Sequence, residues 1–174
     1  VLANGLAGNP VIDDPESGAY AAFYEALLAV CKELAMKMAG DGEGATKLIE
    51  TKVIHADTLE NARILAKSVI TSSLTKAAVY GRDANWGRVL CALGYSGVTF
   101  DPEHCDLYFG SGDDKLLIFT NGSAADYSEE KATELLSGEK VEILADMHMG
   151  DAEATAWGCD LTYDYVKINA DYRS

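Results

Sequence analysis

Three short polar stretches of the chain carry side chains that could bind or react with a small polar molecule. The first is GDGEGATK, residues 40–47, in which Glu43 stands between Gly42 and Gly44. Glycines let a backbone approach a ligand closely, and a carboxylate held there could bind a substrate ammonium group or move a proton. The alternative is that Glu43 belongs to a solvent-exposed loop that follows a helix and binds nothing.

The second stretch is YGRDANWGR, residues 80–88, which places Asp83, Asn85 and Arg88 around the expected start of a helix. A helix N-terminus attracts anions, and an arginine there can bind a carboxylate through two hydrogen bonds. The competing interpretation is ordinary helix capping beside a buried Trp86, with Arg88 paired to an acidic neighbour.

The third stretch is the C-terminal segment CDLTYDYVKINADYRS, residues 159–174, which is richer in aromatic residues than an exposed tail normally is. We expect a strand over residues 163–170, whose two faces would alternate. One face would carry Tyr163, Tyr165, Lys167 and Asn169, and the other Val166, Ile168 and Ala170. The apolar face would anchor the terminus, while Lys167 and Asn169, with Ser174 just beyond, would meet a small polar ligand. The alternative is a solvated edge strand whose lysine opposes aggregation.

The histidines and cysteines show no spacing typical of a metal site or of a common catalytic motif. His55, His104 and His148 are far apart in the sequence, so we expect structural roles for them. The four cysteines are equally scattered and read as reduced thiols in a cytosol-like compartment: Cys31, Cys91, Cys105 and Cys159. We therefore expect no bound metal and no cofactor.

Local signals predict the elements that must position these residues. Asp14 and Pro15 indicate the start of a long amphipathic helix that ends at Gly40. Further helices are expected from the capping box at 57–60, from Asp83 or Asn85 onward, and over 128–136. Strands are expected at 46–56, at 105–110 and 115–122 as a hairpin, and at 140–149 and 154–169 joined around Gly150. Helices early and strands late favour an α/β protein of the α+β layered-sandwich type.

Composition limits the class of protein further. The chain has 174 residues, enough for one domain with a real core, and we expect residues 1–174 to be a single domain. The formal net charge of −14 repels phosphate backbones and anionic lipids, so we expect no nucleic-acid and no membrane partner. No leader and no long apolar run is visible, which makes a cytoplasmic location the expectation.

Four motifs, in this order, resemble one family: VLANG at the start, EGATKLIE, KAAVYGRDANWGRVLCALGYSG and GDAEATAWGCDLTYDYVKINADYRS. They are similar to the C-terminal part of the β chain in the ornithine acetyltransferase family, also called glutamate N-acetyltransferase, of arginine biosynthesis. The resemblance covers nearly the whole chain and is weakest at about residues 100–140. It implies a DmpA-like fold, completed by an α chain and by the start of the β chain.

The resemblance also implies an activity. Family members cut their own precursor before a threonine, which then carries an acetyl group from N-acetylornithine to glutamate; some members also accept acetyl-CoA. An ester intermediate divides a difficult amide transfer into two steps. That threonine corresponds to a position upstream of Val1, so we expect this chain alone to be inactive. The implied assembly is an (αβ)2 heterotetramer in the cytoplasm, or in the mitochondrial matrix if the source is a fungus.

Three substrate-binding positions of the family match residues of this chain. The resemblance assigns them to Glu43, Asn169 and Ser174, where serine replaces the family's common threonine and keeps its hydroxyl. Asp83, Asn85, Arg88 and Lys167 are candidates for a supporting layer around them. Two other functions stay open: a non-catalytic module that binds amino acids, and a threonine amidohydrolase or aminopeptidase of related fold.

Overall fold

The structure is a computed structural model and describes residues 3–111 and 113–172. The chain divides into two compact units, one ending at Ala35 and the other beginning at Met36. Each unit is considered by itself.

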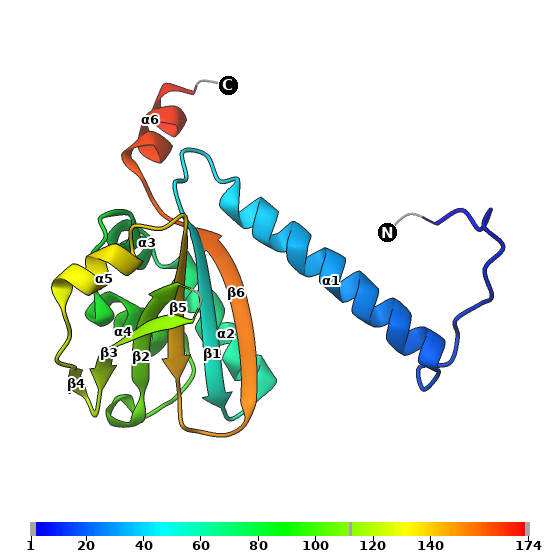
Figure 1. Ribbon diagram of the computed structural model, residues 1–174, viewed down its shortest axis with the longest axis horizontal. Coiled ribbons are helices and arrows are strands. Elements are labelled where there is room, and N and C mark those ends of the chain that lie inside the picture. The colour runs from blue at the N-terminus through cyan, green and yellow to red at the C-terminus, as the bar shows by residue number, and fades with distance from the viewer. Residues whose placement is uncertain (1–2, 112, 173–174) are drawn as a thin grey trace. The chain divides into compact units, whose positions relative to one another are not determined.

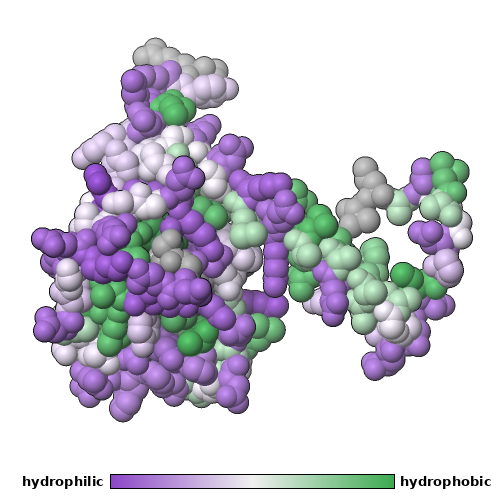
Figure 2. Space-filling view, in the orientation of Figure 1, coloured by the Kyte–Doolittle hydropathy of each residue, from purple (hydrophilic) through white to green (hydrophobic). Residues whose placement is uncertain are grey.

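Helix α1, Gly18–Gly40, starts in the first unit and ends at the predicted glycine. Its start differs from the prediction, because the hydroxyl of Ser17, and not Asp14, accepts a hydrogen bond from the backbone of Tyr20 at 3.1 Å. Asp14 instead closes the turn before the helix by accepting from the backbone N–H of Glu16 at 3.0 Å. Apolar side chains lie at the surface of α1, as the green colouring in Figure 2 shows.

The second unit is built on a six-stranded mixed sheet with the strand order β4-β3-β2-β5-β1-β6 (Figure 1). Its strands are β1 Leu48–Ala56, β2 Asp106–Ser111, β3 Asp114–Thr120, β4 Ser123–Ala124, β5 Lys140–Asp146 and β6 Ala152–Cys159. Strands β1 and β5 run parallel, and the other neighbouring pairs run antiparallel. The predicted β2–β3 hairpin is confirmed. Strands β5 and β6 follow each other in the chain but are not neighbours, because β1 lies between them.

The helices of this unit are α2 Leu59–Thr71, α3 Ser73–Tyr80, α4 Trp86–Gly94, η1 Pro102–His104, α5 Glu129–Leu135 and α6 Tyr163–Asp171. Figure 1 shows α2 and α4 together behind the sheet, on one of its faces. Buried side chains of β1, such as Ile49 and Val53, form a core with Leu65 of α2 and Leu93 of α4. The strand β1 alternates buried and half-buried residues, as expected for a sheet covered by helices on one face. The mixed α/β class is thereby confirmed.

Side-chain caps begin the helices where the sequence signals them, with one small shift. Asn85 caps α4 and Ser128 caps α5, as predicted. The cap of α2 is Thr58, whose hydroxyl accepts from the backbone N–H of Asn61 at 3.1 Å. The neighbouring Asp57 binds the side-chain amide of Asn61 at 2.9 Å, so the predicted capping motif acts one residue later than expected.

The predicted C-terminal strand over 163–170 is wrong. Strand β6 ends at Cys159, and the chain then forms helix α6, which is capped by Thr162. Residues 163, 165, 167 and 169 therefore do not share one face. Tyr165 and Asn169 are neighbours on the helix instead, and the amide of Asn169 donates to the backbone carbonyl of Tyr165 at 2.9 Å.

The face of the sheet away from α2 and α4 carries a polar network. The ammonium group of Lys140 binds Glu50 at 3.1 Å and Glu142 at 3.0 Å, and the indole N–H of Trp157 donates to Glu50 at 2.6 Å. Figure 2 shows hydrophilic and hydrophobic residues interspersed over the side of this unit that faces the viewer. None of the helices in the described part of the chain combines the length and apolar character that crossing a bilayer requires.

Candidate substrate-binding site

Glu43 and Asn169, which the sequence places 126 residues apart, lie in direct contact. The side-chain amide of Asn169 donates a hydrogen bond to Oε2 of Glu43 at 2.9 Å. Both side chains are exposed, so their remaining polar atoms can reach a ligand. The loop at 40–47 and the C-terminal segment, which the family resemblance assigns to substrate binding, thus lie side by side, although the C-terminal segment is a helix.

The loop at 40–47 is attached to the start of α6 by a buried threonine. The hydroxyl of Thr162 donates to the backbone carbonyl of Gly44 at 2.7 Å and accepts from the backbone N–H of Tyr165 at 3.1 Å. Only 4% of Thr162 is exposed. One side chain therefore caps α6 and fixes the loop that carries Glu43.

Two glycines make the close approach of loop and helix feasible. Gly44 has a φ of +67°, and a Cβ added there would lie 2.7 Å from the backbone nitrogen of Tyr165. A Cβ added at Gly42 would lie 2.6 Å from the sulfur of Cys159. The glycines flanking Glu43 thus serve chain packing, which a ligand-free interpretation also explains. In this loop it is the contact between Glu43 and Asn169 that supports a binding site.

Asp160 is a positioning residue that sequence reasoning missed. Its carboxylate is 3% exposed and accepts from the backbone N–H groups of Thr46 at 2.8 Å and Lys47 at 3.0 Å, and from the hydroxyl of Thr46. A carboxylate is stable when buried only with such partners. The available signal was its position directly after strand β6, in the C-terminal motif that contacts the EGATK loop.

An apolar cavity of about 440 Å³ lies between α3 and α6. It is lined by Ala77, Tyr80, Gly81, Leu161, Thr162, Tyr163 and Val166. The rings of Tyr80 and Tyr163 meet edge to face with centroids 5.7 Å apart. On α6, Val166 lies three residues before Asn169 and so on the same side of the helix. The unit therefore offers a carboxylate, an amide and an apolar surface close to one helix.

Asp83, Asn85 and Arg88 form a helix cap, as the simpler interpretation predicted. Asn85 accepts from the backbone N–H of Arg88 at 3.1 Å and donates to Asp83 at 2.9 Å, while Trp86 stacks on the core ring of Phe119 at 5.0 Å. The guanidinium of Arg88 donates to the backbone carbonyl of Leu74 at 3.0 Å, where an acidic partner had been expected. The hydrogen bonds of this cluster serve the packing of α3 and α4, and none of them reaches Glu43.

The remaining predicted residues are Lys167, Ser174 and the histidines, and the structure bears on them differently. Lys167 is exposed on α6, but it lies two residues before Asn169, about 200° away around the helix, so the two side chains do not face the same ligand. Ser174 lies outside the described residues, and its predicted role stays a prediction. His55 and His148 are not isolated, contrary to expectation, since both lie beside Asp146.

Fold and site together define a mixed α/β protein whose surface site joins a glycine-rich loop to a C-terminal helix. The chain belongs to the ArgJ family, whose model matches residues 1–174. It is 56% identical over its whole length to the arginine biosynthesis bifunctional protein ArgJ of Symbiobacterium thermophilum, and 48% identical to that of Thermotoga neapolitana. The chain spans 42% and 44% of the length of these relatives.

The fold agrees with a solved structure as well. The crystal structure of the arginine biosynthesis bifunctional protein ArgJ from Bacillus halodurans superimposes with a TM-score of 0.89 at 45% identity, covering 97% of this chain and 77% of that one. The predicted family membership is therefore confirmed, with relatives that are named arginine biosynthesis bifunctional proteins.

Proposed function

We propose that this chain forms one wall of the active site of an acetyltransferase that moves an acetyl group from N-acetylornithine to glutamate. The observation that carries the proposal is the hydrogen bond between Glu43 and Asn169. It joins the two motifs that the family resemblance assigns to substrate binding. The names of the relatives, arginine biosynthesis bifunctional proteins, support the same activity.

The proposed reaction uses a threonine hydroxyl from outside this chain. Its oxygen attacks the acetyl carbon of N-acetylornithine, the C–N bond breaks, and the departing amine takes up the proton that the hydroxyl loses. The amino group of glutamate then attacks the ester, forms a new amide and returns the threonine to its hydroxyl form. Acetyl-CoA is a candidate second donor.

Within this scheme the described residues bind and orient the amino acid. Glu43 accepts hydrogen bonds from the substrate ammonium group, or relays the proton of the departing amine. Asn169 holds the Glu43 carboxylate in place and turns its amide oxygen to the substrate. The buried Asp160 and Thr162 keep the loop and the helix at a fixed separation, which limits the loss of entropy when substrate binds.

The same proposal includes partners and compartment. We infer an α chain and the start of the β chain as the missing parts, assembled as (αβ)2, with neither metal nor cofactor needed for the acetyl transfer itself. The free thiols of all four cysteines are consistent with the cytoplasm.

The test uses the complete protein with Asn169→Ala and Glu43→Gln. Hydrogen bonds to charged groups contribute about 1.5–3 kcal/mol, so we expect kcat/KM for N-acetylornithine to fall by roughly 10- to 100-fold. Asp171→Ala, at the exposed end of the same helix, serves as the control and should keep wild-type kinetics. Unchanged kinetics in both test variants would remove the Glu43–Asn169 pair from the site.

Product analysis separates the other functions. Acetyl transfer requires glutamate or ornithine as acceptor, whereas an amidohydrolase releases acetate without either. A binding module would show N-acetylornithine binding by calorimetry and no turnover. Acetate release that is independent of the acceptor would contradict the transferase proposal.

A further inference from the structure

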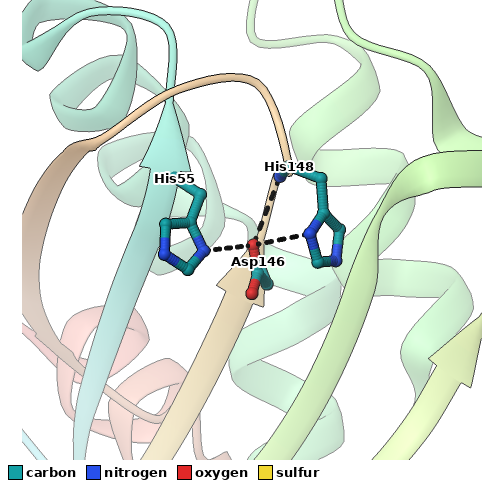
Figure 3. Close-up of side chains that lie close together, drawn as sticks. All are labelled: His55, Asp146 and His148. Atoms are coloured by element: carbon teal, nitrogen blue, oxygen red, sulfur yellow. Dashed lines mark hydrogen bonds and ion pairs between the residues drawn. The ribbon is translucent and has the colours of Figure 1, made fainter.

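Two histidines and one carboxylate converge where β1 and β5 end (Figure 3). Nδ1 of His55 lies 2.8 Å from Oδ1 of Asp146, and Nδ1 of His148 lies 3.5 Å from the same oxygen. The three potential ligand atoms all lie within 4.8 Å of one another. This arrangement brings His55, near the end of β1, together with Asp146 at the end of β5 and His148 in the loop that follows β5.

The backbone is shaped to place both histidines there. Strands β1 and β5 are parallel, and Ile54 pairs with Asp146, so the two carboxyl ends lie side by side. Strand β1 has an irregularity between Val53 and Ala56, where His55 adopts a φ of +53°. His148 has a φ of +50°. Residues other than glycine rarely adopt such values, so both histidine backbones are strained.

Hydrogen bonds hold the two histidine backbones in these conformations. The carbonyl of His55 accepts from the backbone N–H of Met149 at 2.7 Å and of Gly150 at 2.9 Å. The backbone N–H of His148 donates to Oδ1 of Asp146 at 3.2 Å. The cluster is therefore fixed by the main chain of β1 and of the loop after β5 before any ligand enters.

The far side of one imidazole carries a second carboxylate. Nε2 of His148 lies 2.8 Å from Oδ2 of Asp106, which is on β2, next to β5 in the sheet. Histidines that bind metals commonly donate the N–H of their other nitrogen to a carboxylate, which fixes the tautomer and makes the ligand more basic. With the proton on Nε2, the lone pair of Nδ1 faces Oδ1 of Asp146. Two electron-rich atoms that face each other repel unless a proton or a metal cation lies between them.

We propose that His55, Asp146 and His148 bind a divalent transition-metal ion of the zinc type, through two imidazole nitrogens and one carboxylate oxygen. Imidazole with carboxylate suits Zn²⁺ and its neighbours, whereas Mg²⁺ and Ca²⁺ prefer oxygen ligands alone. About half of each imidazole is exposed, 51% for His55 and 47% for His148, so water can complete the coordination.

The metal would join segments that are distant in the chain. It would tie the end of β1 to the end of β5 and to the loop leading into β6. Glu43 precedes the other end of β1, so the site lies one full strand length away from the Glu43–Asn169 pair. The consequence to measure is therefore metal affinity and metal-dependent stability of the fold, and this proposal does not depend on the acetyltransferase activity.

The experiment uses the complete protein, stripped with a chelator and titrated with ZnCl₂ by calorimetry, and with Co²⁺ by visible absorption. We expect one zinc equivalent that disappears in His55→Ala and in His148→Ala. Asp106→Asn keeps all three ligands and should lower the affinity for zinc by about 10- to 100-fold. His104→Ala is the matched control, because His104 also binds a carboxylate, Asp101, at 2.8 Å but has no third donor among the residues that the structure describes.

Thermal melting with and without zinc provides a second readout. Zinc should raise the Tm of the wild type and of His104→Ala, and leave that of His55→Ala unchanged. Circular dichroism of each metal-free variant establishes that it is folded. Equal zinc binding by the wild type and the two histidine variants, or no saturable binding at micromolar zinc, would overturn the proposal.

Discussion

At the scale of single residues, the geometry of the site depends on a glycine in the loop at 40–47 and on two buried polar side chains. Gly44 lies close to the α6 backbone, and the side chains of Asp160 and Thr162 form hydrogen bonds with the backbone of the loop. Glu43 and Asn169 contribute the exposed chemistry but little of the rigidity. Substitutions at the first group should therefore act on stability, and substitutions at the second group on catalysis.

Gly44→Ala should destabilise the fold, because it combines an unfavourable φ of +67° with a Cβ only 2.7 Å from the nitrogen of Tyr165. Gly97→Ala is the control: its φ is +90°, but nothing lies within 4 Å of the added carbon. Strain at positive φ costs of order 1–3 kcal/mol, and Gly44→Ala should exceed the control by a further amount of similar size. Urea unfolding measures both, and equal losses would mean that the loop can move away from α6.

Cys105 should make stability depend on alkaline pH. Burial raises the pKa of its thiol to about 12, helped by the charges of Asp106 and Asp146. The unfolded chain releases this proton near 9.0, while the folded chain keeps it. The contribution is therefore complete below that pH and is lost as the pH rises toward 12, by about 1.4 kcal/mol per unit. Urea unfolding between pH 8 and 11 should show a shallower decline for Cys105→Ala than for the wild type. Parallel curves would contradict this account.

The sequence indicated only some of these residues. Glu43 and Asn169 stood in motifs that resemblance could assign, and the structure brings them together. Asp160 and the cluster of His55, Asp146 and His148 were missed, because their roles come from contacts across distant parts of the chain. Neither composition nor local spacing contains that information.

At the scale of elements, strong local signals gave correct predictions and ambiguous ones failed. Strand β1, the β2–β3 hairpin and the capped helices α4 and α5 were all recognisable from β-branched runs, turn residues and caps. Helix α3 was missed, since its eight residues directly follow α2. Helix α6 was mistaken for a strand because it has no buried residue, so no core imposes a helical pattern on its side chains.

Thr162→Ala should loosen α6 more than the loss of a cap alone. Removing a threonine cap costs typically about 1 kcal/mol, and here the bond to the carbonyl of Gly44 is lost as well. Ser128→Ala, which removes only the cap of α5, is the matched control. Amide hydrogen exchange should show faster exchange across α6 in Thr162→Ala than in the wild type. Protection in α6 equal to that of the wild type would contradict the double role of Thr162.

At the scale of the whole molecule, the chain accounts for 42% of the length of its S. thermophilum relative. Strand order and the pairing of β1 with both β5 and β6 could not be predicted, because they depend on long-range packing. The formal net charge of −14 follows directly from the sequence, and it argues against nucleic acids as partners because their phosphate backbones are negatively charged.

The 174-residue chain by itself should not transfer acetyl groups, because the proposed threonine belongs to another segment. Co-expression with the complementary segments of the family precursor should restore transfer from N-acetylornithine to glutamate. Transfer of a radiolabelled acetyl group from N-acetylornithine to glutamate measures the activity of the isolated chain and of the co-expressed segments. Turnover by the isolated chain would place the nucleophile among its own residues.

The central position of β1 also has a consequence for how the protein is made. Strand β1 ends at Ala56, whereas its two partners begin only at Lys140 and Ala152. A ribosome that adds about 5–20 residues per second thus leaves this strand, with its core residues Ile49 and Val53, without partners for several seconds. Newly made chains should be most prone to aggregate during that interval, and chaperone binding to nascent β1 is the expected protection.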